Sequence, residues 1–370
     1  MPVDPPFTPL VRSLPATTPF VGPEALERQS GQPFRARIGA NESVFGPSPR
    51  TVAAMREAAP EVWKYGDPEN YDLKAALARH YGVRPENIAI GEGADGLLGL
   101  LARMVVSDGT PVVTSHGAYP TFNYHVVGYG GRFEYVPFHG DHEDPEALIA
   151  KAAETKAPLI FLANPDNPMG SWNEAADVQR MIDAVPDGAL LCLDEAYFEF
   201  APQSAIPPID VSNPRVIRIR TFSKAYGMAG ARVGYAIAHE SIASAFNKVR
   251  NHFGVNRVAQ IGALAALADQ DHVRQVQGWV REARERIGEI AATNGLKALP
   301  SATNFVAIDC GRDGAFAKAV LNELIARGIF VRMPFVPPHD RCIRVTTGRA
   351  QELDAFAEAL PQALAAASAE

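Results

Sequence analysis

A lysine among small residues is the first candidate for chemistry in this sequence. The segment "TFSKAYGMAGARVGY", residues 221–235, places Lys224 after the apolar run "RVIRI" and before a glycine-rich turn that leads to Arg232. An amine at the end of a buried strand can attack a carbonyl carbon, and a nearby arginine can hold an anion. A single lysine is usually a surface residue, so this interpretation depends on what else gathers around Lys224.

Polar and small residues follow three other apolar runs of the sequence. "GEGADG" follows "IAI", "NPDNPMG" follows "LIFLA", and "DEAY" follows "ALLCL". Each segment by itself is compatible with a turn, a helix cap or a salt bridge. The candidate site residues in these segments and beside Lys224 are Gly93, Ala94, Asp95, Asn167, Asp194, Tyr197, Thr221 and Ser223. A reactive amine, a carboxylate, an asparagine and a phosphate-binding turn together suit an aldehyde cofactor with a ring nitrogen and a phosphate, which is pyridoxal 5′-phosphate (PLP).

The elements that would position these residues alternate between strand and helix from about residue 88 to 238. Several of the strands are short, continuous apolar runs, which is typical of a mainly parallel sheet covered on both faces. In such a sheet ligands bind beyond the carboxyl ends of the strands, and this is where the candidate residues lie. The sequence therefore predicts a doubly wound α/β domain with its site at that edge.

The pattern changes after residue 241, where long helices begin, including one at roughly 271–294. A smaller mixed region and an alanine-rich terminal helix follow, so we predict a second, smaller α+β domain. We assign residues 35–262 to the large domain, and residues 1–34 with 263–370 to an N-terminal arm and the small domain. The first thirty or so residues are rich in proline and are expected to be extended. Helices are expected near residues 48–60 and over 71–81.

Composition and charge describe an ordinary globular protein. The chain is 47% hydrophobic and 21% charged, with a net charge of −7 and no basic stripe, so neither nucleic acid nor an anionic membrane is an expected partner. The cysteines Cys192, Cys310 and Cys342 are far apart, and the N-terminus lacks the apolar core of a signal peptide. Both features favour a cytoplasmic protein, and the run at 111–131 is broken by Pro120 and by glycines, so no membrane span is predicted.

The segment "HGDHED", residues 139–144, holds two histidines and three carboxylates and could suggest a metal site. It lies between an expected strand and an expected helix. Asp144 followed by Pro145 fits a helix N-cap with proline at the first helical position. We therefore predict a helix start here and no metal.

Three motifs give the sequence a family resemblance. "TFSKAYGMAGARVGY", "NPDNPMG" and "DEAYFEF", in this order and spacing, resemble the fold-type-I PLP-dependent aminotransferases. "GANESVFGPSP" and "IRVTTG" resemble the histidinol-phosphate aminotransferase subfamily, and the resemblance covers nearly the whole chain from about residue 35. It implies an aspartate-aminotransferase-like fold, in which a large PLP-binding domain carries a mostly parallel seven-stranded sheet beside a smaller α+β domain.

The resemblance also implies roles for the residues around the cofactor ring. Lys224 would form a Schiff base with the cofactor aldehyde and then move the proton at the substrate carbon. Asp194 would keep the pyridine nitrogen protonated, since an opposite charge favours the cationic ring. Asn167 and Tyr197 would bond the phenolic oxygen, and Tyr119 would stack on the ring or, alternatively, be a core tyrosine. Lys224, Asp194 and Tyr197 are thus the expected catalytic residues.

The phosphate of the cofactor would be held by a second group of residues. These are the backbone of Ala94 and Asp95 at the Gly93 turn, together with Thr221, Ser223 and Arg232. Tyr65 matches a tyrosine that in this family reaches the phosphate of the neighbouring subunit, which implies a homodimer with shared active sites. The alternative for Tyr65 is a buried loop tyrosine.

For the substrate, the resemblance implies Arg344 as the main anion-binding residue, with Arg332, Phe20 and Asn41 beside it. The sequence departs from the subfamily after Arg332, where "MPFVPPHDR" is apolar, and at "TPFVGPE", which contains Phe20. Both changes make the pocket less polar, so the amino donor is histidinol phosphate or an aromatic amino acid, with 2-oxoglutarate as the acceptor in a ping-pong exchange. The alternatives are an aromatic aminotransferase proper, a decarboxylase resembling phosphothreonine decarboxylase, and a non-catalytic PLP-binding regulator.

Overall fold

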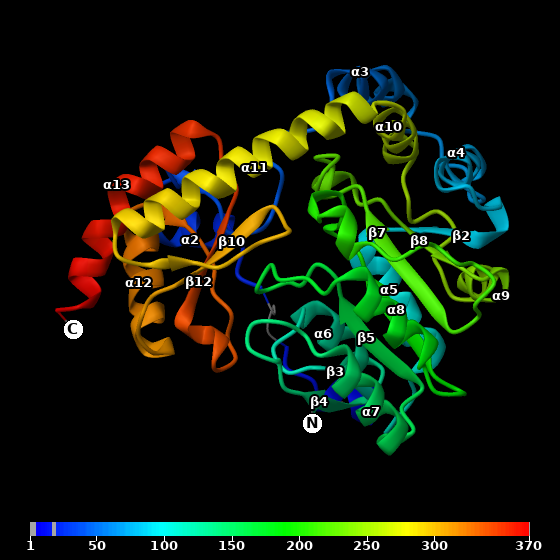
Figure 1. Cartoon of the computed structure of the whole chain (residues 1–370). Coiled ribbons are helices and arrows are strands. Elements are labelled where there is room, and N and C mark those ends of the chain that lie inside the picture. Colours follow the sequence, from blue (N-terminus) through cyan, green and yellow to red (C-terminus); the bar gives the residue numbers. More distant parts are fainter. Residues whose placement is uncertain (1–4, 17–19, 370) are drawn as a thin grey trace.

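The computed structural model describes residues 5–16 and 20–369, which form a larger and a smaller α/β unit (Figure 1). The long helix α11 (Gln270–Thr293) runs from one unit to the other along one side of the molecule. Its first half contributes Val273, Val276 and Val280 to the core of the large unit. Its second half contributes Ala283, Ile287, Ile290 and Ala291 to the core of the small unit. The apolar positions recur every three or four residues, so one face of α11 is buried in both units.

The central sheet of the large unit has seven strands in the order β2-β8-β7-β6-β5-β3-β4. All are parallel except β8, which pairs antiparallel with both of its neighbours. The strands are β2 (Ile88–Gly91), β3 (Pro111–Ser115), β4 (Arg132–Val136), β5 (Leu159–Ala163), β6 (Leu190–Asp194), β7 (Val216–Thr221) and β8 (Gly234–Ala238). This sheet confirms the fold class predicted from the sequence.

The apolar runs of the sheet are continuous because helices cover both of its faces. In β5, Leu159 and Phe161 pack into one apolar cluster, whereas Ile160 and Leu162 pack into another on the opposite face. Alternate residues of a strand point to opposite faces, so both sets must be apolar. The helices of this unit are α3 (Pro49–Ala58), α4 (Tyr71–Tyr81), α5 (Gly93–Val105), α6 (Pro120–Gly128), α7 (Pro145–Thr155), α8 (Ala175–Asp183), α9 (Glu240–Ala245) and α10 (Arg257–Ala268).

The predicted helix over 71–81 coincides with α4, which ends at Gly82 in the left-handed conformation, where glycine has no steric penalty. By contrast, the sequence did not predict α6. Its segment "PTFNYHVVG" contains aromatic and β-branched residues, and only Phe122 and Val126 are buried. Such a segment has no clear apolar stripe of helical period, and packing against α5 decides its conformation.

The small unit contains two short sheets. In one, β1 (Ala36–Arg37) pairs parallel with β11 (Ile329–Phe330), and in the other the order is β12-β10-β9. The strands of the second sheet are β9 (Lys297–Ala298), β10 (Phe305–Asp309) and β12 (Cys342–Thr346). The helices are α2 (Pro23–Ser30), α12 (Gly314–Ala326) and α13 (Ala350–Ala367). Short 3-10 helices occur along the chain at η1 (Ala59–Glu61), η2 (Pro85–Asn87), η3 (Phe198–Phe200), η4 (Gln203–Ala205), η5 (Ala229–Ala231), η6 (Phe246–Lys248) and η7 (His339–Arg341).

The packing bears on where the two units divide. Ala36 and Ile38 pack in the core of the small unit, although the sequence assigned them to the large one. At the other boundary, α10 continues to Ala268 and packs along α3 of the large unit. We therefore propose that the chain passes between the units near residues 40 and 269, rather than at 35 and 262.

The N-terminal segment is less extended than the sequence suggested. It forms α1 (Pro9–Ser13) and α2, each with a proline in its first turn. Proline fits the first turn of a helix because the N–H that it lacks would be unpaired there. In α1, the side chain of Thr8 caps the helix by accepting a hydrogen bond from the Val11 amide at 3.2 Å. The expected arm also includes residues 1–4 and 17–19, which lie outside the described residues.

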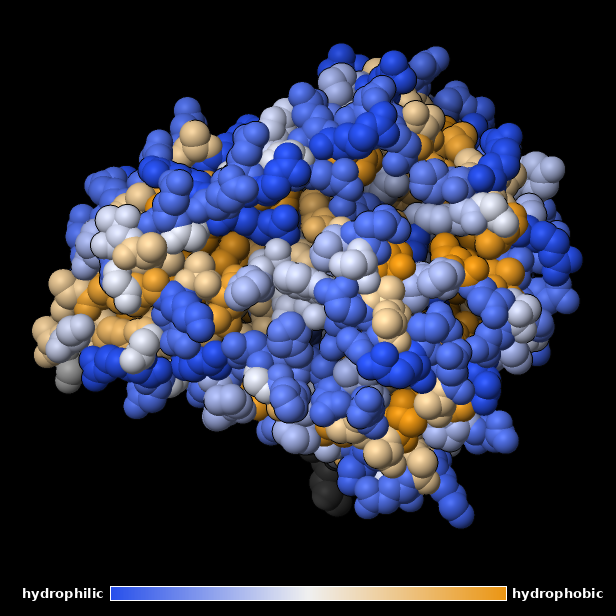
Figure 2. All heavy atoms as spheres, in the orientation of Figure 1, coloured by the Kyte–Doolittle hydropathy of each residue, from blue (hydrophilic) through white to orange (hydrophobic). Residues whose placement is uncertain are grey.

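Hydrophilic side chains cover most of the face seen in Figure 2, and hydrophobic ones show in smaller patches. This distribution agrees with a chain that buries apolar residues in several cores. Cys192, Cys310 and Cys342 are all buried and free. Among the described residues, no helix is both long and apolar enough to span a membrane.

Candidate active site

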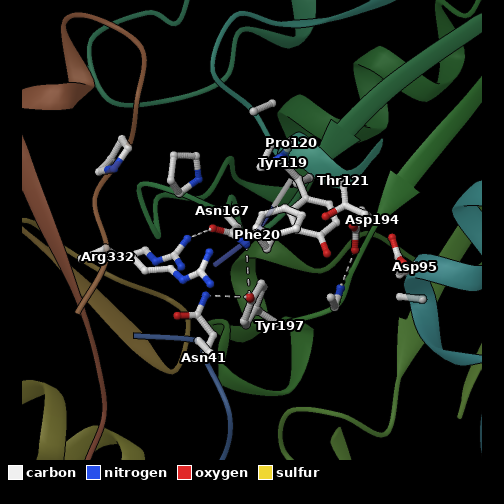
Figure 3. Close-up of a pocket in the computed structure, with 18 of the residues that line it drawn as sticks. Phe20, Asn41, Asp95, Tyr119, Pro120, Thr121, Asn167, Asp194, Tyr197 and Arg332 are labelled. Atoms are coloured by element: carbon white, nitrogen blue, oxygen red, sulfur yellow. Dashed lines mark hydrogen bonds between the residues drawn. The ribbon is translucent and has the colours of Figure 1, made fainter. Parts of the chain in front are cut away.

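A cavity of about 560 Å³ lies at the carboxyl edge of the large sheet, between the two units. Figure 3 shows side chains of the large unit, such as Asp194 and Tyr197, facing Arg332 of the small unit across it. The predicted site residues that line the cavity are Phe20, Asn41, Ala94, Asp95, Tyr119, Asn167, Asp194, Tyr197, Thr221, Ser223, Lys224, Arg232, Arg332 and Arg344. Gly93 lies directly beneath Arg232, while Tyr65 lies elsewhere. The structure thus brings together residues that the sequence connected by their positions after strands or by the family resemblance.

Lys224 follows β7 and projects into the cavity, where its Nζ donates a hydrogen bond to the backbone oxygen of Asn41 at 3.0 Å. Removal from water, together with the positive charge of Arg344, lowers the pKa of Lys224 to about 8. Burial favours the neutral form of an amine, which is the form that attacks a carbonyl. The site therefore prepares Lys224 as a nucleophile near neutral pH.

Asp194 ends β6 and is only 5% exposed. Its Oδ1 accepts a hydrogen bond from the amide of Ala196 at 2.9 Å. Burial, together with a smaller contribution from the neighbouring Glu195, raises the pKa of Asp194 to about 7. A cationic ring nitrogen beside this carboxylate would offset the desolvation, because an opposite charge stabilises the ionised form. The position therefore fits the protonated pyridine of PLP.

Tyr197, Asn41 and Asn167 form a hydrogen-bonded group on the floor of the cavity. The Tyr197 hydroxyl accepts hydrogen bonds from Asn41 Nδ2 at 3.0 Å and from Asn167 Nδ2 at 3.4 Å. Burial raises the pKa of Tyr197 above its ordinary value, so the phenol keeps its proton and can donate it to an oxygen in the cavity. Asn41 has a positive φ of 58°, and Thr346 Oγ1 donates to its Oδ1 at 3.0 Å. Backbone strain of this kind is typical of functional sites.

The N-terminus of α5 and the side chain of Arg232 form an anion-binding corner. The first turn of α5 presents free amides at Ala94 and Asp95. The Arg232 side chain lies beside this turn and donates hydrogen bonds to Glu92 O at 3.2 Å and to Ala229 O at 2.9 Å. A Cβ on Gly93 would lie 2.5 Å from Arg232 Nη2, so only glycine permits this approach. The corner suits the phosphate of PLP.

Two hydroxyl groups complete this corner on the other side. Thr221 Oγ1 donates to Ser223 Oγ at 2.9 Å, and the Ser223 amide donates to Thr221 Oγ1 at 3.1 Å. Both residues belong to the short segment that carries Lys224, so the amine and the hydroxyls are positioned together.

Replacing Gly93 by alanine is expected to weaken PLP binding by about tenfold to a hundredfold. The new Cβ displaces Arg232, and a hydrogen bond to a charged group contributes about 1.5–3 kcal/mol. Equilibrium dialysis of apoprotein against PLP measures the change. Gly82→Ala is the matched control, because Gly82 also has a positive φ, of 68°, but has open space around it. Equal losses of PLP affinity in both variants would attribute the effect to backbone strain instead.

The two predicted tyrosines differ in their environments. Tyr119 lines the cavity at the start of α6, and burial raises its pKa to about 12. Tyr65 is 77% exposed and lies against Phe253, with 4.6 Å between ring centroids. The structure therefore contradicts the alternative of a buried loop tyrosine for Tyr65, and it places this residue on the surface, away from the cavity of its own chain.

Arg344 and Arg332 converge on the cavity from two segments of the small unit. Their backbones pair through two hydrogen bonds of 3.2 and 2.6 Å, so both side chains emerge on the same side. Arg344 Nη1 donates to Asn167 Oδ1 at 2.5 Å, and Arg332 Nη2 donates to Val21 O at 3.0 Å. The Nε atoms of both arginines are buried without a hydrogen-bond partner among the described residues. Two cations with unused donors point to an anionic ligand.

The sequence missed three residues of the outer cavity wall, namely His116, Asn123 and Tyr135, whereas Phe335 and Val336 lie in the apolar segment "MPFVPPHDR" that the sequence placed at the pocket. The rings of His116 and Tyr135 lie 4.9 Å apart. Val336 lies close to Gly117, because a Cβ added to Gly117 would be 3.1 Å from the Cβ of Val336. His116 directly follows β3, so the rule that located the other residues beyond strand ends would have found it. Tyr135 and Asn123 carry no comparable signal.

The segment "HGDHED" starts a helix, as predicted. Asp144 caps α7 by accepting a hydrogen bond from the Ala147 amide at 3.0 Å. Over residues 5–16 and 20–369, no group of three or more histidine, cysteine, aspartate or glutamate side chains is arranged to hold a metal ion.

Comparison with known proteins identifies the family. Residues 37–360 match the family described as aminotransferase class I and II. A histidinol-phosphate aminotransferase of Anaeromyxobacter sp. (strain Fw109-5) is 36% identical over 371 residues, which cover 99% of this chain and all of the relative. The crystal structure of histidinol-phosphate aminotransferase from Sinorhizobium meliloti in complex with pyridoxal-5′-phosphate has a TM-score of 0.96 at 56% identity, covering 98% of this chain and 99% of that one.

A more distant structure shows the fold alone. Aspartate aminotransferase from Thermus thermophilus with maleate has a TM-score of 0.79 at 20% identity, covering 97% of this chain and 99% of that one. The predicted fold class and family are thereby confirmed. The chain belongs to the class I and II aminotransferases, the family whose PLP-dependent chemistry its motifs predicted.

Proposed function

We propose that this protein is a PLP-dependent transaminase that transfers the amino group of histidinol phosphate to 2-oxoglutarate in two half-reactions. The observation that carries the proposal is a single cavity that holds Lys224, Asp194 and two arginines with unused donors. The similarity to histidinol-phosphate aminotransferases over nearly the whole chain supports the choice of donor.

Different residues of the cavity would serve different parts of the cofactor. PLP, when bound, supplies an electron sink for the carbon that carries the amino group. Lys224, with its pKa lowered to about 8 chiefly by burial, would hold the cofactor aldehyde and would then remove or return the proton at that carbon. Asp194 would keep a proton on the ring nitrogen, and Tyr197 with Asn167 would bond the ring oxygen. Arg232 and the first turn of α5 would hold the phosphate.

The two substrates carry different anions, and the arginines suit both. Histidinol phosphate has a phosphate and no carboxylate, whereas 2-oxoglutarate has two carboxylates. Arg344 lies beside Asn167, near the reacting end, and Arg332 lies beside Phe20, with its guanidinium 5.5 Å from that ring. A planar guanidinium binds either anion through two parallel hydrogen bonds. Two arginines at different depths can therefore hold one anion or two.

An aromatic amino acid is the second candidate donor. Phe20, Tyr135 and Phe335 line the cavity together with Met333 and Val336, so part of its outer wall is apolar. An aromatic side chain would bury its ring against these residues.

An assay of the purified holoenzyme distinguishes these functions. Histidinol phosphate, phenylalanine and tyrosine are supplied separately with 2-oxoglutarate, and glutamate formation is followed. We expect the highest kcat/KM with histidinol phosphate. A higher value with phenylalanine or tyrosine would favour the aromatic aminotransferase. Release of CO2 without a keto acid would favour a decarboxylase, and no reaction with any donor would exclude the transaminase.

Arg344→Gln is expected to lower kcat/KM by roughly tenfold to a hundredfold, mainly through KM. The variant loses charge-assisted hydrogen bonds to the substrate anion, which contribute about 1.5–3 kcal/mol. Steady-state kinetics with both substrates measure the change. Arg284→Gln is the control, since Arg284 is a partly buried arginine of α11 that bonds Ser301 O at 2.6 Å outside the cavity. A similar loss of activity in the control would point to general destabilisation.

We further propose a homodimer in which Tyr65 reaches the cofactor phosphate of the partner. Val62, Trp63, Tyr65 and Phe253 are exposed hydrophobic residues, and Tyr65 lies against Phe253. Exposed apolar residues that gather in one place favour an interface. A fully active monomer in analytical ultracentrifugation would exclude the shared site.

A further inference from the structure

The loop at residues 139–144 is fixed to the large unit by three of its residues. Asp144 caps α7, and Glu143 accepts a hydrogen bond from the Ala163 amide at the end of β5, at 2.9 Å. His142 Nδ1 lies 3.0 Å from the backbone oxygen of Trp172. These contacts leave Gly140 and Asp141, in the same loop, to meet the small unit.

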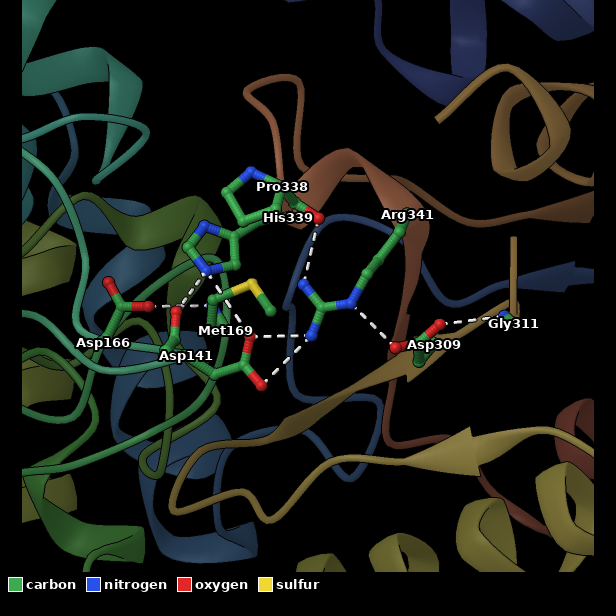
Figure 4. Close-up of polar contacts among 9 residues, drawn as sticks. Asp141, Asp166, Met169, Asp309, Gly311, Pro338, His339 and Arg341 are labelled. Atoms are coloured by element: carbon green, nitrogen blue, oxygen red, sulfur yellow. Dashed lines mark hydrogen bonds and ion pairs between the residues drawn. The ribbon is translucent and has the colours of Figure 1, made fainter. Parts of the chain in front are cut away.

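Asp141 meets Arg341 of the small unit in an ion pair with two contacts. Arg341 Nη2 lies 2.8 and 3.1 Å from the two carboxylate oxygens of Asp141. Arg341 Nε donates to Asp309 Oδ2 at 2.7 Å, and its Nη1 donates to Pro338 O at 2.9 Å. Figure 4 shows the guanidinium between Asp141 of the large unit and Asp309 of the small unit. We refer to Asp141, Asp309, His339 and Arg341 as the interdomain bridge.

The bridge has a second polar contact and an apolar base. The His339 ring is 2% exposed, and its Nε2 lies 3.0 Å from the backbone oxygen of Gly140. The same ring packs edge-on against Phe138, with 4.6 Å between centroids. Phe138 belongs to an apolar cluster that also contains Met169 of the large unit and Cys342 of the small unit. The bridge therefore surrounds a packed contact and does not stand alone on the surface.

Arg341 directly precedes β12, the strand that carries Arg344. The bridge fixes the beginning of this strand to the large unit. Three residues farther along, Arg344 touches Asn167 of the large unit in the cavity. An extended backbone has little freedom along its length. Fixing Arg341 therefore also fixes the place of Arg344, three residues farther along.

We propose that Asp141 and Arg341 are positioning residues for substrate binding, which hold β12 so that Arg344 presents its guanidinium to the substrate anion. The inference rests on the proposed function, in which Arg344 binds that anion. Asp141 and Arg341 touch neither the cavity nor the cofactor-binding residues. Loss of the bridge should therefore weaken the binding of anionic ligands and leave the cofactor and the chemical step unchanged.

Asp141→Asn in the holoenzyme tests this inference. We expect KM for both substrates to rise about threefold to tenfold, with kcat changed less than twofold, as for an ion pair that is partly shielded from water. The visible absorption of the bound cofactor should stay the same. Asp141→Glu, which keeps the charge, should restore most of the affinity, and Asp141→Asn with Arg341→Gln should be no worse than Arg341→Gln alone.

Glu323→Gln is the matched control. Glu323 in α12 forms an ion pair with Arg327, which directly follows the helix, and these side chains are 26% and 27% exposed, against 31% for Asp141 and 24% for Arg341. It should leave KM unchanged even if the melting temperature falls as much as in Asp141→Asn. An unchanged KM in Asp141→Asn would overturn the proposal, and so would a parallel loss of PLP affinity.

Binding of succinate separates this inference from the proposed function. Succinate carries two carboxylates but no amine, so its affinity is measured from the absorption of the holoenzyme without any turnover. We expect Asp141→Asn to weaken it about threefold to tenfold, whichever amino donor the wild-type protein uses. A wild-type protein that binds succinate but does not transaminate would reject the proposed function alone. Absence of succinate binding in the wild type would remove the anion-binding role of Arg344 and the bridge with it.

Discussion

Lys224→Ala is expected to lower turnover by at least about 10⁴-fold while the protein still binds PLP. The magnitude follows from the loss of both the covalent anchor and the general base, which alone contributes about 10²–10⁴-fold. We expect PLP binding to persist because Arg232, the first turn of α5 and Asp194 would hold the phosphate and the ring nitrogen independently of the amine. Single-turnover absorption measurements with saturating PLP and histidinol phosphate give the rate.

Lys74→Ala is the matched control for this experiment. Lys74 lies on α4, and burial also lowers its pKa, but it is outside the cavity, so turnover should be unchanged. Borohydride reduction of the wild-type holoenzyme should leave a pyridoxyl group on the peptide that contains Lys224, and none should form there in Lys224→Ala. Near-normal turnover of the variant would remove Lys224 from the mechanism.

Asp194→Asn is expected to lose activity without losing stability. An amide cannot keep the ring nitrogen protonated, and loss of a charge-assisted hydrogen bond of about 1.5–3 kcal/mol predicts a decrease in kcat of roughly tenfold to a hundredfold or more. The structure otherwise accommodates asparagine, whose side-chain oxygen can still accept the hydrogen bond from the Ala196 amide. Steady-state kinetics and urea unfolding of the apoprotein measure the two effects.

The difference in stability between the Asp194→Asn variant and the wild-type apoprotein depends on pH, because only the wild type carries the Asp194 carboxyl. Burial raises the pKa of Asp194 from 3.8 to about 7 in the folded protein. The folded state therefore binds a proton at Asp194 more tightly than the unfolded state does. Proton binding stabilises the folded wild type fully below about pH 4, and this stabilisation is lost as the pH rises through 7. At pH 8 the wild-type apoprotein carries a buried carboxylate, and Asn removes a penalty of at most about 4 kcal/mol. We expect the variant to be at least as stable as the wild type at pH 8 and to lose this advantage towards pH 5.

Glu199→Gln provides the comparison for Asp194→Asn. Burial also raises the pKa of Glu199, to about 8, but this residue does not line the cavity. Its replacement should raise the stability of the apoprotein at alkaline pH in the same way and leave kcat unchanged. If Asp194→Asn instead unfolds at lower urea concentration than the wild type at pH 8, the loss of activity is a consequence of structural damage.

Much of the fold could be predicted because the large sheet is encoded locally. Strand β5 is buried on both faces, so its apolar run identifies it without knowledge of its partners. The failures occurred where local preference is weak. Helix α6 lacks an apolar stripe of helical period, and the strand β1 contains only Ala36 and Arg37, which pair with residues near 329. No pattern in two residues can specify a partner so far along the chain.

The candidate site was also predictable where it depends on local sequence and not where it depends on distant contacts. Thr221, Ser223 and Lys224 lie on one short segment after β7, and Asp194 and Tyr197 follow β6, so the sequence alone fixed their spacing and their common edge of the sheet. The family resemblance named Arg344, Arg332, Phe20 and Asn41 for the substrate, but no local pattern in the sequence indicated which residues of the large unit they contact. Arg344 bonds Asn167 across 177 residues of chain, and Asn41 bonds Tyr197 across 156.

The sequence by itself determined the identity of the reactive groups, their order along the sheet edge and the family, because these depend on local spacing and on the alternation of strand and helix. Only the tertiary structure decided how reactive the groups are and which contacts they make with the predicted residues of the small unit. The pKa values of Lys224 and Asp194 move to about 8 and about 7 chiefly because packing removes water from both side chains. The loop at 139–144 shows both cases, since Asp144 caps α7 within the large unit, whereas Asp141 meets Arg341 only when the two units pack together.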